Sequence, residues 1–365
     1  MPLCQTYETY MKDQEIPIYR EYFIEDVREI KLAPWKGRGC NAAFLQLAGQ
    51  EGVVEVRVQE IEPGKTLTPM KMGVDEAIYV AKGQGVGAVS GTKDGVKKTF
   101  EWGPHSLFLI PANTWYQLSN MSGTEPARLV HYNYLPIALT ATPDLDFFLN
   151  HPDENGGSRV LDSIGGEFYS QAKAVEEASG KIRGAGSIDY YWLGNFFPDL
   201  KAWDKLSPYR GRGAGGRVIF VKFPTAEMDA HMSVFPSRTY KKGHRHGPGV
   251  VIVIPSGEGY SLMWPEGGEK LVVPWREGSI FVPPNRWFHQ HFNLGGEPAR
   301  YLAFHAPPQL MINAEKLEDA QRDQFEYPDE DPSIRERFEG ELANRGLTSL
   351  MPEGAYQDRS FEWEY

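Results

Sequence analysis

What the sequence lacks already excludes several classes of protein. It has only two cysteines, Cys4 and Cys40, among 365 residues, which excludes both a disulfide framework and a cysteine-rich zinc site. Its strongly apolar runs are short, such as residues 250–254, whereas a membrane span requires about 18 residues. The first residues contain no basic stretch followed by an apolar one, so we predict no secretory signal and expect a reduced cytoplasm.

Positive charge is scarce relative to negative charge. The chain has 38 lysines and arginines against 49 aspartates and glutamates, which gives a net charge of −11 at pH 7. The summed field repels phosphate backbones and anionic membrane surfaces. We therefore expect neither nucleic acid nor a membrane as a partner.

Glycine and proline are abundant instead. With 38 Gly, 27 Pro and 13% aromatic residues, the composition is typical of turn-rich strands rather than of a helical bundle. An all-β fold is predicted, and the length corresponds to two or three domains of about 150 residues.

The chain carries an internal duplication. Residues 111–117 align without a gap on residues 283–289, at an offset of 172. Further upstream, residues 78–85 align on residues 252–259 at an offset of 174. Two related β domains therefore account for most of the length.

Short segments with strand-like patterns, separated by turn signals, occur in both copies. They lie at residues 53–62, 76–82, 106–111 and 128–134 in the first copy, and at residues 218–223, 232–235, 250–255, 279–283 and 300–305 in the second. Each copy is expected to form a β barrel or sandwich.

The segments outside the two copies differ in character. Between the copies, the pattern predicts a helix over 168–179 and a loop over the glycine-rich residues 211–216. The acidic tail from about residue 314 predicts one or two charged helices, one beginning near Pro332, that pack against a barrel.

Four of the nine histidines form two His-x-His pairs, His244 with His246 and His289 with His291. Alternate residues of a strand share a face, so each pair can point two imidazoles into one barrel interior, within range of one metal ion. The alternative is that these histidines are polar fillers satisfied by backbone groups or water. Crowded neutral imidazoles desolvate one another unless a cation organises them, which favours a metal site.

These histidines fall within two motifs. The second motif has the pattern Gly, five residues, Pro, one residue, Gly, two residues, His, three residues, Asn. Gly278, Pro284, His289 and Asn293 fall at these spacings, and Arg286 stands in place of the second glycine. The first motif has the pattern His-x-His, three or four residues, Glu, six residues, Gly. His244, His246 and Gly257 fit this pattern, and Val250 stands at the glutamate position. On these residues the chain resembles the cupins, specifically a two-domain bicupin, over residues 45–136 and 216–310.

The resemblance implies two double-stranded β-helix (cupin, jelly-roll) barrels with a helical linker and C-terminal helices. The implied boundaries are an N-terminal arm (1–44), an N-terminal barrel (45–136), a linker (137–215), a C-terminal barrel (216–310) and an acidic helical tail (311–365). It also implies one divalent metal held by His244, His246 and His289. His291 is the alternative third ligand, or a group that contacts the substrate.

Val250 is the most informative departure from the motif. Without a carboxylate, three neutral imidazoles leave the full charge of the ion to attract an anionic, chelating substrate. This three-histidine pattern is similar to cupins of the gentisate and diketone-cleaving dioxygenase type, which implies a ferrous ion, a small anionic substrate and O2. Mn, Zn or Ni are the alternatives, since a lost carboxylate is also compatible with a non-redox metal.

The N-terminal copy has a different set of residues at the ligand positions. Met70 and Met72 replace the first two histidines, Glu76 is kept, and Gln117 aligns with His289. This is a poor set for a hard or borderline cation, so this barrel is predicted to bind no metal and to serve a structural role, including contacts of a homodimer. A copper site on the two methionines is the alternative to simple core filling.

Further candidates for the reaction surround the histidines of the second copy. If the strand register persists, Arg238 and Tyr240 share the side of His244, whereas Arg245 faces away. Gln290 and His231 are further catalytic candidates, His231 as an acid or base. Together with Trp264, Arg286 and Trp287, these residues are expected to supply an arginine fork and aromatic walls for a planar carboxylated substrate.

Three functions fit these features. The first is a ferrous dioxygenase that cleaves a C–C bond of a small aromatic or enolisable acid. The second is a non-redox Zn or Mn isomerase, hydrolase, decarboxylase or lyase. The third is a bicupin that binds a small ligand or metal without turnover.

Overall fold

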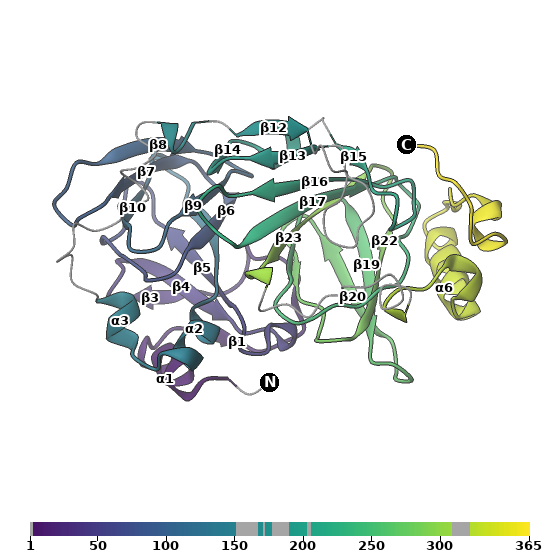
Figure 1. The fold of residues 1–365 in the computed structure, drawn as a ribbon, viewed down its shortest axis with the longest axis horizontal. Coiled ribbons are helices and arrows are strands. Elements are labelled where there is room, and N and C mark those ends of the chain that lie inside the picture. The colour runs from purple at the N-terminus through teal and green to yellow at the C-terminus, as the bar shows by residue number, and fades with distance from the viewer. Residues whose placement is uncertain (1–2, 151–166, 171, 177–189, 203–205, 309–321) are drawn as a thin grey trace.

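The structure is a computed structural model that describes residues 3–150, 167–170, 172–176, 190–202, 206–308 and 322–365. Within these residues, two β barrels lie side by side and the helices are confined to the flanks (Figure 1). Each barrel is formed by one large and one small sheet. The predicted all-β fold with two jelly-roll barrels is therefore confirmed. Among the helices in the described part of the chain, none has the length and apolar character that a membrane crossing requires.

The large sheet of the N-terminal barrel has the order β1-β4-β5-β11-β6-β9-β14, with β3 paired to β4, and the small sheet has the order β10-β7-β8. The strands are β1 (Ile18–Tyr19), β3 (Ala33–Trp35), β4 (Cys40–Leu45), β5 (Glu55–Ile61), β6 (Glu76–Lys82), β7 (Gly85–Ser90), β8 (Lys98–Trp102), β9 (Leu107–Ile110), β10 (Trp115–Asn120), β11 (Ala127–Asn133) and β14 (Phe196–Phe197). Three helices lie together at one end of this barrel (Figure 1): α1 (Gln5–Asp13), α2 (Leu135–Ala141) and α3 (Leu145–Leu149).

The large sheet of the C-terminal barrel has the order β12-β13-β16-β17-β23-β18-β21-β2, with β15 paired to β16, and the small sheet has the order β20-β19-β22. The strands are β2 (Phe23–Ile24), β12 (Lys173–Glu176), β13 (Tyr190–Leu193), β15 (Ser207–Pro208), β16 (Arg217–Lys222), β17 (Asp229–Phe235), β18 (Val251–Ser256), β19 (Glu258–Trp264), β20 (Leu271–Arg276), β21 (Ile280–Phe281), β22 (Phe288–Asn293) and β23 (Ala299–His305). All nine strands expected from the sequence are present, with ends within three residues of the predicted ones.

The central strands are buried on both faces because each barrel packs against the other. On β5, Val56 and Val58 contribute to the apolar cluster between the barrels, while Glu55 and Arg57 point into the interior of their own barrel. On β17, Met232 faces the other barrel in the same way. The polar side of each central strand is therefore the inner side, and this is the side on which a site can be built.

The structural alignment of the two copies around residues 105–120 differs from the ungapped sequence match, which has an offset of 172. His105 and Asn113 have positive φ angles, and the residues with the matching turn geometry are Gly278 and Arg286, at an offset of 173. Trp115–Asn120 is therefore the counterpart of Phe288–Asn293. Because a one-residue shift turns every side chain of a strand to the other face, this correction changes which residues correspond inside the barrels.

The predicted linker helix is wrong within the described residues. Lys173–Glu176 form strand β12, which pairs with Tyr190–Leu193 of β13, and residues 171 and 177–179 of the predicted helix lie outside the described residues. The glycine-rich residues 211–216 form a loop, as predicted.

In the tail, α6 (Pro332–Ala343) confirms the predicted helix near Pro332. The Asp331 side chain accepts the Ser333 amide proton at its N-terminus. Its apolar stripe of Ile334, Phe338 and Leu342 packs on the outside of the C-terminal barrel.

The large sheet of each barrel includes a short strand from a segment that lies outside its own copy. Phe23 and Ile24 of β2 pair with Phe281 and Ile280 of β21, in the C-terminal barrel. In the opposite direction, β14 from the segment between the copies pairs with β9 of the N-terminal barrel.

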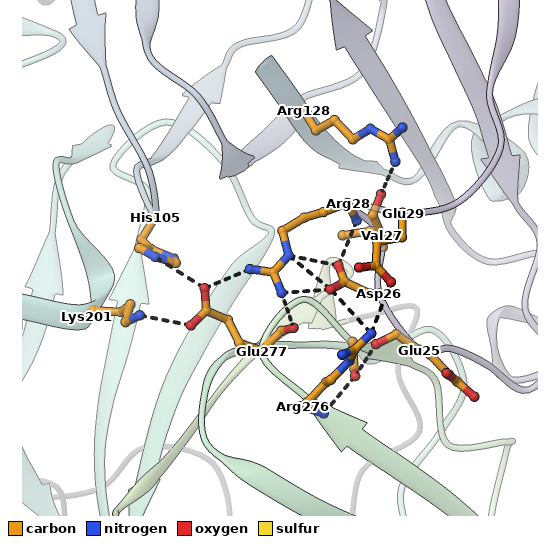
Figure 2. A network of polar contacts seen from close by, with 11 residues as sticks. Glu25, Asp26, Val27, Arg28, Glu29, His105, Arg128, Lys201, Arg276 and Glu277 are labelled. Atoms are coloured by element: carbon orange, nitrogen blue, oxygen red, sulfur yellow. Dashed lines mark hydrogen bonds and ion pairs between the residues drawn. The ribbon is translucent and has the colours of Figure 1, made fainter. Parts of the chain in front are cut away.

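A polar network joins the segment after β2 to both barrels (Figure 2). The Arg28 side chain donates to the buried Asp26 carboxylate from Nε, at 2.9 and 3.2 Å, and from Nη2, at 2.7 Å. It also donates to Glu277, at 3.0 Å to the carboxylate and 2.8 Å to the carbonyl oxygen. Lys201 donates to Glu277 at 3.1 Å, and Arg276 donates to Glu29 at 3.1 Å. The two barrels are thus fixed to one another by polar contacts as well as by apolar packing.

Candidate metal centre

The three histidines predicted to bind a metal converge in the C-terminal barrel. His289 lies on β22, and His244 lies on the adjacent segment, where the two backbones form an isolated antiparallel bridge. The ring centroids are 4.2 Å apart for His244 and His289, 4.7 Å for His246 and His289, and 5.8 Å for His244 and His246. One nitrogen from each ring lies within 4.8 Å of the other two. The structure therefore brings all three predicted ligands together, and we call them the histidine triad.

The triad has the protonation state that a metal requires. Burial lowers the pKa of His244 and His289 well below the ordinary value, and it lowers the pKa of His246 to about 4. The rings are therefore neutral at pH 7, so each has a lone pair available for a cation.

Backbone groups orient two of the three rings. His246 Nδ1 donates to the Gly247 carbonyl oxygen at 2.7 Å, and His289 Nδ1 donates to that of Trp287 at 3.2 Å. A neutral imidazole that donates through Nδ1 presents the lone pair of Nε2, which is the usual way a backbone carbonyl positions a metal ligand. His244 Nδ1 is buried without a hydrogen-bond partner. The donor set fits one divalent cation.

No carboxylate joins the triad among the described residues. Val250, at the usual glutamate position, is buried in an apolar cluster of the C-terminal barrel. Its counterpart in the first copy is Glu76, at the offset of 174. Within the described part of the chain, the candidate ligand set therefore consists of imidazoles alone.

His291 lies beside the triad rather than within it. Its ring centroid is 5.6 Å from that of His289 and 5.0 Å from that of Tyr301, and its Nδ1 lies 2.8 Å from Ser261 Oγ. Burial lowers its pKa to about 3. His291 therefore lines the interior next to the triad, and the geometry groups His289 with His244 and His246.

Three predicted catalytic residues do not face the triad. Tyr240 bonds to Glu330 and stacks on Phe292 at 4.8 Å, and Gln290 donates to Glu330 at 3.2 Å, so both lie on the outside of the barrel under the tail. Arg238 is at the surface and contacts the Thr348 carbonyl oxygen at 3.5 Å. These placements correct the prediction.

The physical reason is a one-residue bulge. Tyr240 pairs with Phe292, which by simple register would place residue 243 opposite His289, but His244 occupies that position. The extra residue inverts the inside–outside alternation between 240 and 244. Lys241, rather than Tyr240, is therefore the residue that points inward.

The predicted arginine fork and aromatic walls are engaged elsewhere. Arg245 and Arg286 both bond to Asp323, at 3.1 and 2.7 Å, and Arg245 also faces outward as expected, over the Phe288 ring at 4.5 Å. Trp264 packs in the cluster beneath the tail, and Trp287 packs near Tyr22, at 5.9 Å. None of these side chains contacts the triad in the described structure.

His231 faces the interior and belongs to a hydrogen-bonded chain. Its Nδ1 lies 3.0 Å from His305 Nε2, and His305 Nδ1 donates to Asp229 Oδ1 at 2.6 Å. Burial would raise the pKa of Asp229, but the bond from His305 and the charge of Lys222 lower it to about 2. His231, His305 and Asp229 thus form one continuous hydrogen-bonded chain. His231 Nε2, at the end of this chain, is buried in the interior without a hydrogen-bond partner.

Sequence reasoning missed several interior groups, namely His305, Asp229, Lys241, Ser233 and Tyr301. His305 and Asp229 pair across β17 and β23, as Ser233 and Tyr301 do. Alternation along β17 from His231 was the signal available for Asp229 and Ser233. For Lys241 no such signal existed, because the bulge is not visible in the pattern.

The N-terminal barrel holds an arginine where the other barrel holds the triad. Arg57 is fully buried, forms ion pairs with Glu55 and Glu76, and its Nη2 lies 3.6 Å from Met72 Sδ. Burial would raise the pKa of Glu76, but the charge of Arg57 holds it far below its ordinary value. A guanidinium thus supplies the positive charge at this position, which disfavours both a divalent cation and copper at the methionines.

The alignment of Gln117 with His289 is also corrected. Gln117 points outward to Lys97, at 3.1 Å, whereas Tyr116 donates to Glu76 at 2.7 Å inside the barrel. Tyr116 forms the isolated bridge with Met70 that His289 forms with His244, and it is therefore the structural counterpart of His289.

Two jelly-roll barrels with a histidine triad in the second define the fold as that of a bicupin. No family model and no curated protein matches the sequence. Among solved structures, a formate complex of oxalate decarboxylase from Lactobacillus farciminis is similar, with 12% identity, 80% of this chain and 88% of that chain covered, and a TM-score of 0.49. Oxalate decarboxylase from Bacillus subtilis is 11% identical, with 95% of this chain and 86% of that chain covered and a TM-score of 0.49. Vicilin from Capsicum annuum is 14% identical, with 81% of this chain and 86% of that chain covered and a TM-score of 0.47. The chemistry of the site therefore rests on this chain's own residues.

Proposed function

We propose that this chain is a metal-dependent cupin enzyme that acts on a small anionic molecule in the C-terminal barrel. The observation that carries the proposal is the convergence of three neutral imidazoles without a carboxylate. His244, His246 and His289 would hold one divalent metal. When bound, such an ion supplies a Lewis acid with an undiminished double charge and, if it is ferrous, the capacity to use O2.

The favoured reaction is the oxygen-dependent cleavage of a C–C bond in an aromatic or enolisable acid. An ion held by three neutral ligands on one side leaves its other positions for the substrate. In this reaction the protein's own residues bind and orient the anion and exclude water. His231 Nε2, whose ring is linked through His305 to Asp229, is the group placed to hold a proton removed from a substrate hydroxyl.

Metal loading and oxygen uptake test this proposal. Metal-stripped protein is reconstituted anaerobically with ferrous iron, and oxygen uptake is then recorded on hydroxy-aromatic acids and β-diketones. His244→Ala is expected to lose both iron and uptake. Met70→Ala is the matched control, because Met70 occupies the corresponding position in the other barrel and should leave both unchanged. Absence of iron binding by the unmodified protein, or uptake unaffected by His244→Ala, would contradict the proposal.

A second candidate is a non-redox Mn or Zn isomerase, hydrolase or lyase. The observation that favours it is the chain His231–His305–Asp229, which is acid–base equipment that such reactions need and that does not depend on O2. Tightly held Mn or Zn in the purified protein, with turnover that is equal in air and under nitrogen, would decide for this candidate and against the dioxygenase.

A further inference from the structure

A buried lysine lies in the same interior as the triad, and the proposed metal chemistry does not use it. Lys241 is fully buried, and its Nζ donates to Ser233 Oγ and lies 3.4 Å from the Tyr301 hydroxyl. The Nζ also lies 4.6 Å from the centroid of the Tyr209 ring and 5.0 Å from that of Tyr301. Tyr301 in turn contacts His291, which contacts His289 of the triad. Lys241 is therefore two side chains away from the triad.

Lys241 has no anionic partner among the described residues. The groups that face it from the surrounding elements are His231, Ser233 and Phe235 of β17, Tyr301 of β23, Tyr209 and the more distant Arg212 of the preceding loop, and His291 of β22. None of these is a carboxylate. Burial, with a contribution from the positive charge of Arg212, lowers the pKa of Lys241 well below its ordinary value. An isolated ammonium in such a place is costly, so the site favours an incoming anion.

The duplicated barrel shows that the fold does not require these polar groups. Lys241 donates its backbone N–H to the His291 carbonyl oxygen, and in the other barrel Leu67 donates to Leu118 in the same way. Tyr301 pairs with Ser233 where Leu129 pairs with Gln59. The counterparts of Lys241, His291 and Tyr301 are therefore three buried leucines: Leu67, Leu118 and Leu129. Where the N-terminal barrel has three leucines and Gln59 in this layer, the C-terminal barrel has four polar side chains.

A second observation points to a ligand in this layer. His231 Nε2 is buried without a hydrogen-bond partner, and its ring lies 5.6 Å from that of Tyr301 and 6.1 Å from that of Tyr209. A buried polar atom of this kind is normally satisfied in native proteins. An amine without a counter-ion and an unpaired imidazole nitrogen thus border the same two tyrosines.

We propose that Lys241, Ser233 and Tyr301 form the binding site for a carboxylate of the substrate, next to the triad. The inference rests on the proposed function and narrows it to substrates that carry a carboxylate beside a metal-binding oxygen. The carboxylate would accept hydrogen bonds from Lys241 Nζ and the Tyr301 hydroxyl, and the pair would be neutralised by a proton taken up at Lys241.

Salicylate and its neutral analogue salicylamide test this inference by calorimetry on Zn-loaded protein, in which no redox turnover takes place. The unmodified protein is expected to bind salicylate at least tenfold more tightly than salicylamide. Lys241→Leu, which introduces the side chain that Leu67 has at the corresponding position, is expected to lose at least tenfold in salicylate affinity and less than twofold in salicylamide affinity. Lys242→Leu removes a neighbouring charge that pairs with Glu326 outside the site and should change neither.

Proton uptake and a metal-free sample complete the experiment. In two buffers of different ionisation enthalpy at pH 8, salicylate binding should take up close to one proton in the unmodified protein and none in Lys241→Leu. Equal losses for both probes, no preference for salicylate in the unmodified protein, or unchanged proton uptake would overturn the inference. In parallel, metal-free protein is titrated with zinc. Failure of the triad to bind zinc is thereby recorded separately from failure of Lys241 to bind the carboxylate.

Discussion

The backbones of His244 and His289 exchange two hydrogen bonds, of 3.1 and 2.8 Å. The neighbouring pair on the same two segments is Tyr240 with Phe292. Four residues separate the two pairs on one segment, but only three separate them on the other. The bulge between these two pairings sets the composition of the site. It places Lys241 inside the barrel with the triad and leaves Tyr240 outside, under the tail. A local irregularity of one residue thus determines which side chain accompanies the metal ligands.

Adjacent residues on β22 should differ sharply in their effect on metal binding. His289→Gln removes an imidazole from the triad and is expected to reduce the metal content of the purified protein at least tenfold. Gln290→Met alters a buried side chain that faces Glu330 and should retain full metal content. Elemental analysis of both variants, with urea unfolding to confirm that they fold, makes the comparison. Equal metal loss in the two would refute the assignment of faces.

Glu330 should make the attachment of the tail dependent on pH. Burial raises its pKa from 4.5 to about 7, so between pH 4.5 and 7 the folded protein holds a proton that the unfolded chain has released. The stabilisation is complete below pH 4.5 and is lost as the pH rises to 7, a change of about 3 kcal/mol. Glu330→Gln should remove this slope from the free energy of unfolding, measured from pH 4.5 to 8. Glu336→Gln, on the exposed face of α6, should keep the slope of the unmodified protein.

Arg57 should be essential to the stability of the N-terminal barrel. Replacing it with Met leaves Glu55 and Glu76 buried without their cation, which costs about 3–5 kcal/mol. Adding Glu55→Gln and Glu76→Gln to Arg57→Met should recover most of that loss, because no buried charge is then unpaired. Equilibrium unfolding in urea measures both variants. A loss below about 1 kcal/mol for Arg57→Met would show that the ion pairs contribute little.

The two arginines of the network between the barrels should contribute unequally to the free energy of unfolding. Arg28 serves a buried carboxylate and Glu277, so Arg28→Met is expected to lower the free energy of unfolding by about 2 kcal/mol. Arg276 is more than half exposed and pairs with the exposed Glu29, so Arg276→Met should cost less than about 0.5 kcal/mol. Thermal unfolding of the two variants checks the order, and the reverse order would mean that exposure does not govern this network.

The sequence predicts the elements that local pattern controls. The strands follow from alternating or buried runs, and α6 from its cap at Asp331 and its apolar stripe. The two His-x-His pairs predict that four imidazoles share one interior, and the resemblance to the cupins selects His289 rather than His291 as the third ligand.

The errors arise where tertiary pairing decides the outcome. Lys173–Glu176 become a strand because β13 offers them a partner, which overrides their local preference. The assignments of Tyr240 and Arg238 fail because the bulge before His244 reverses a face, and no residue type marks it. The assignment of Gln117 fails because the best ungapped sequence match is one residue away from the structural alignment. His305 was missed because its bonds to His231 and Asp229 join residues that lie 74 and 76 positions apart in the chain.

The pairing of β2 with β21 also constrains how the chain can mature. Phe281 and Ile280, the partners of Phe23 and Ile24, are synthesised more than 250 residues later. Until then the segment around Asp26 and Arg28 has neither its sheet neighbour nor Glu277. The edge of the C-terminal barrel therefore closes on a segment synthesised more than 250 residues earlier, so the barrel with the triad cannot be completed until β21 has been made.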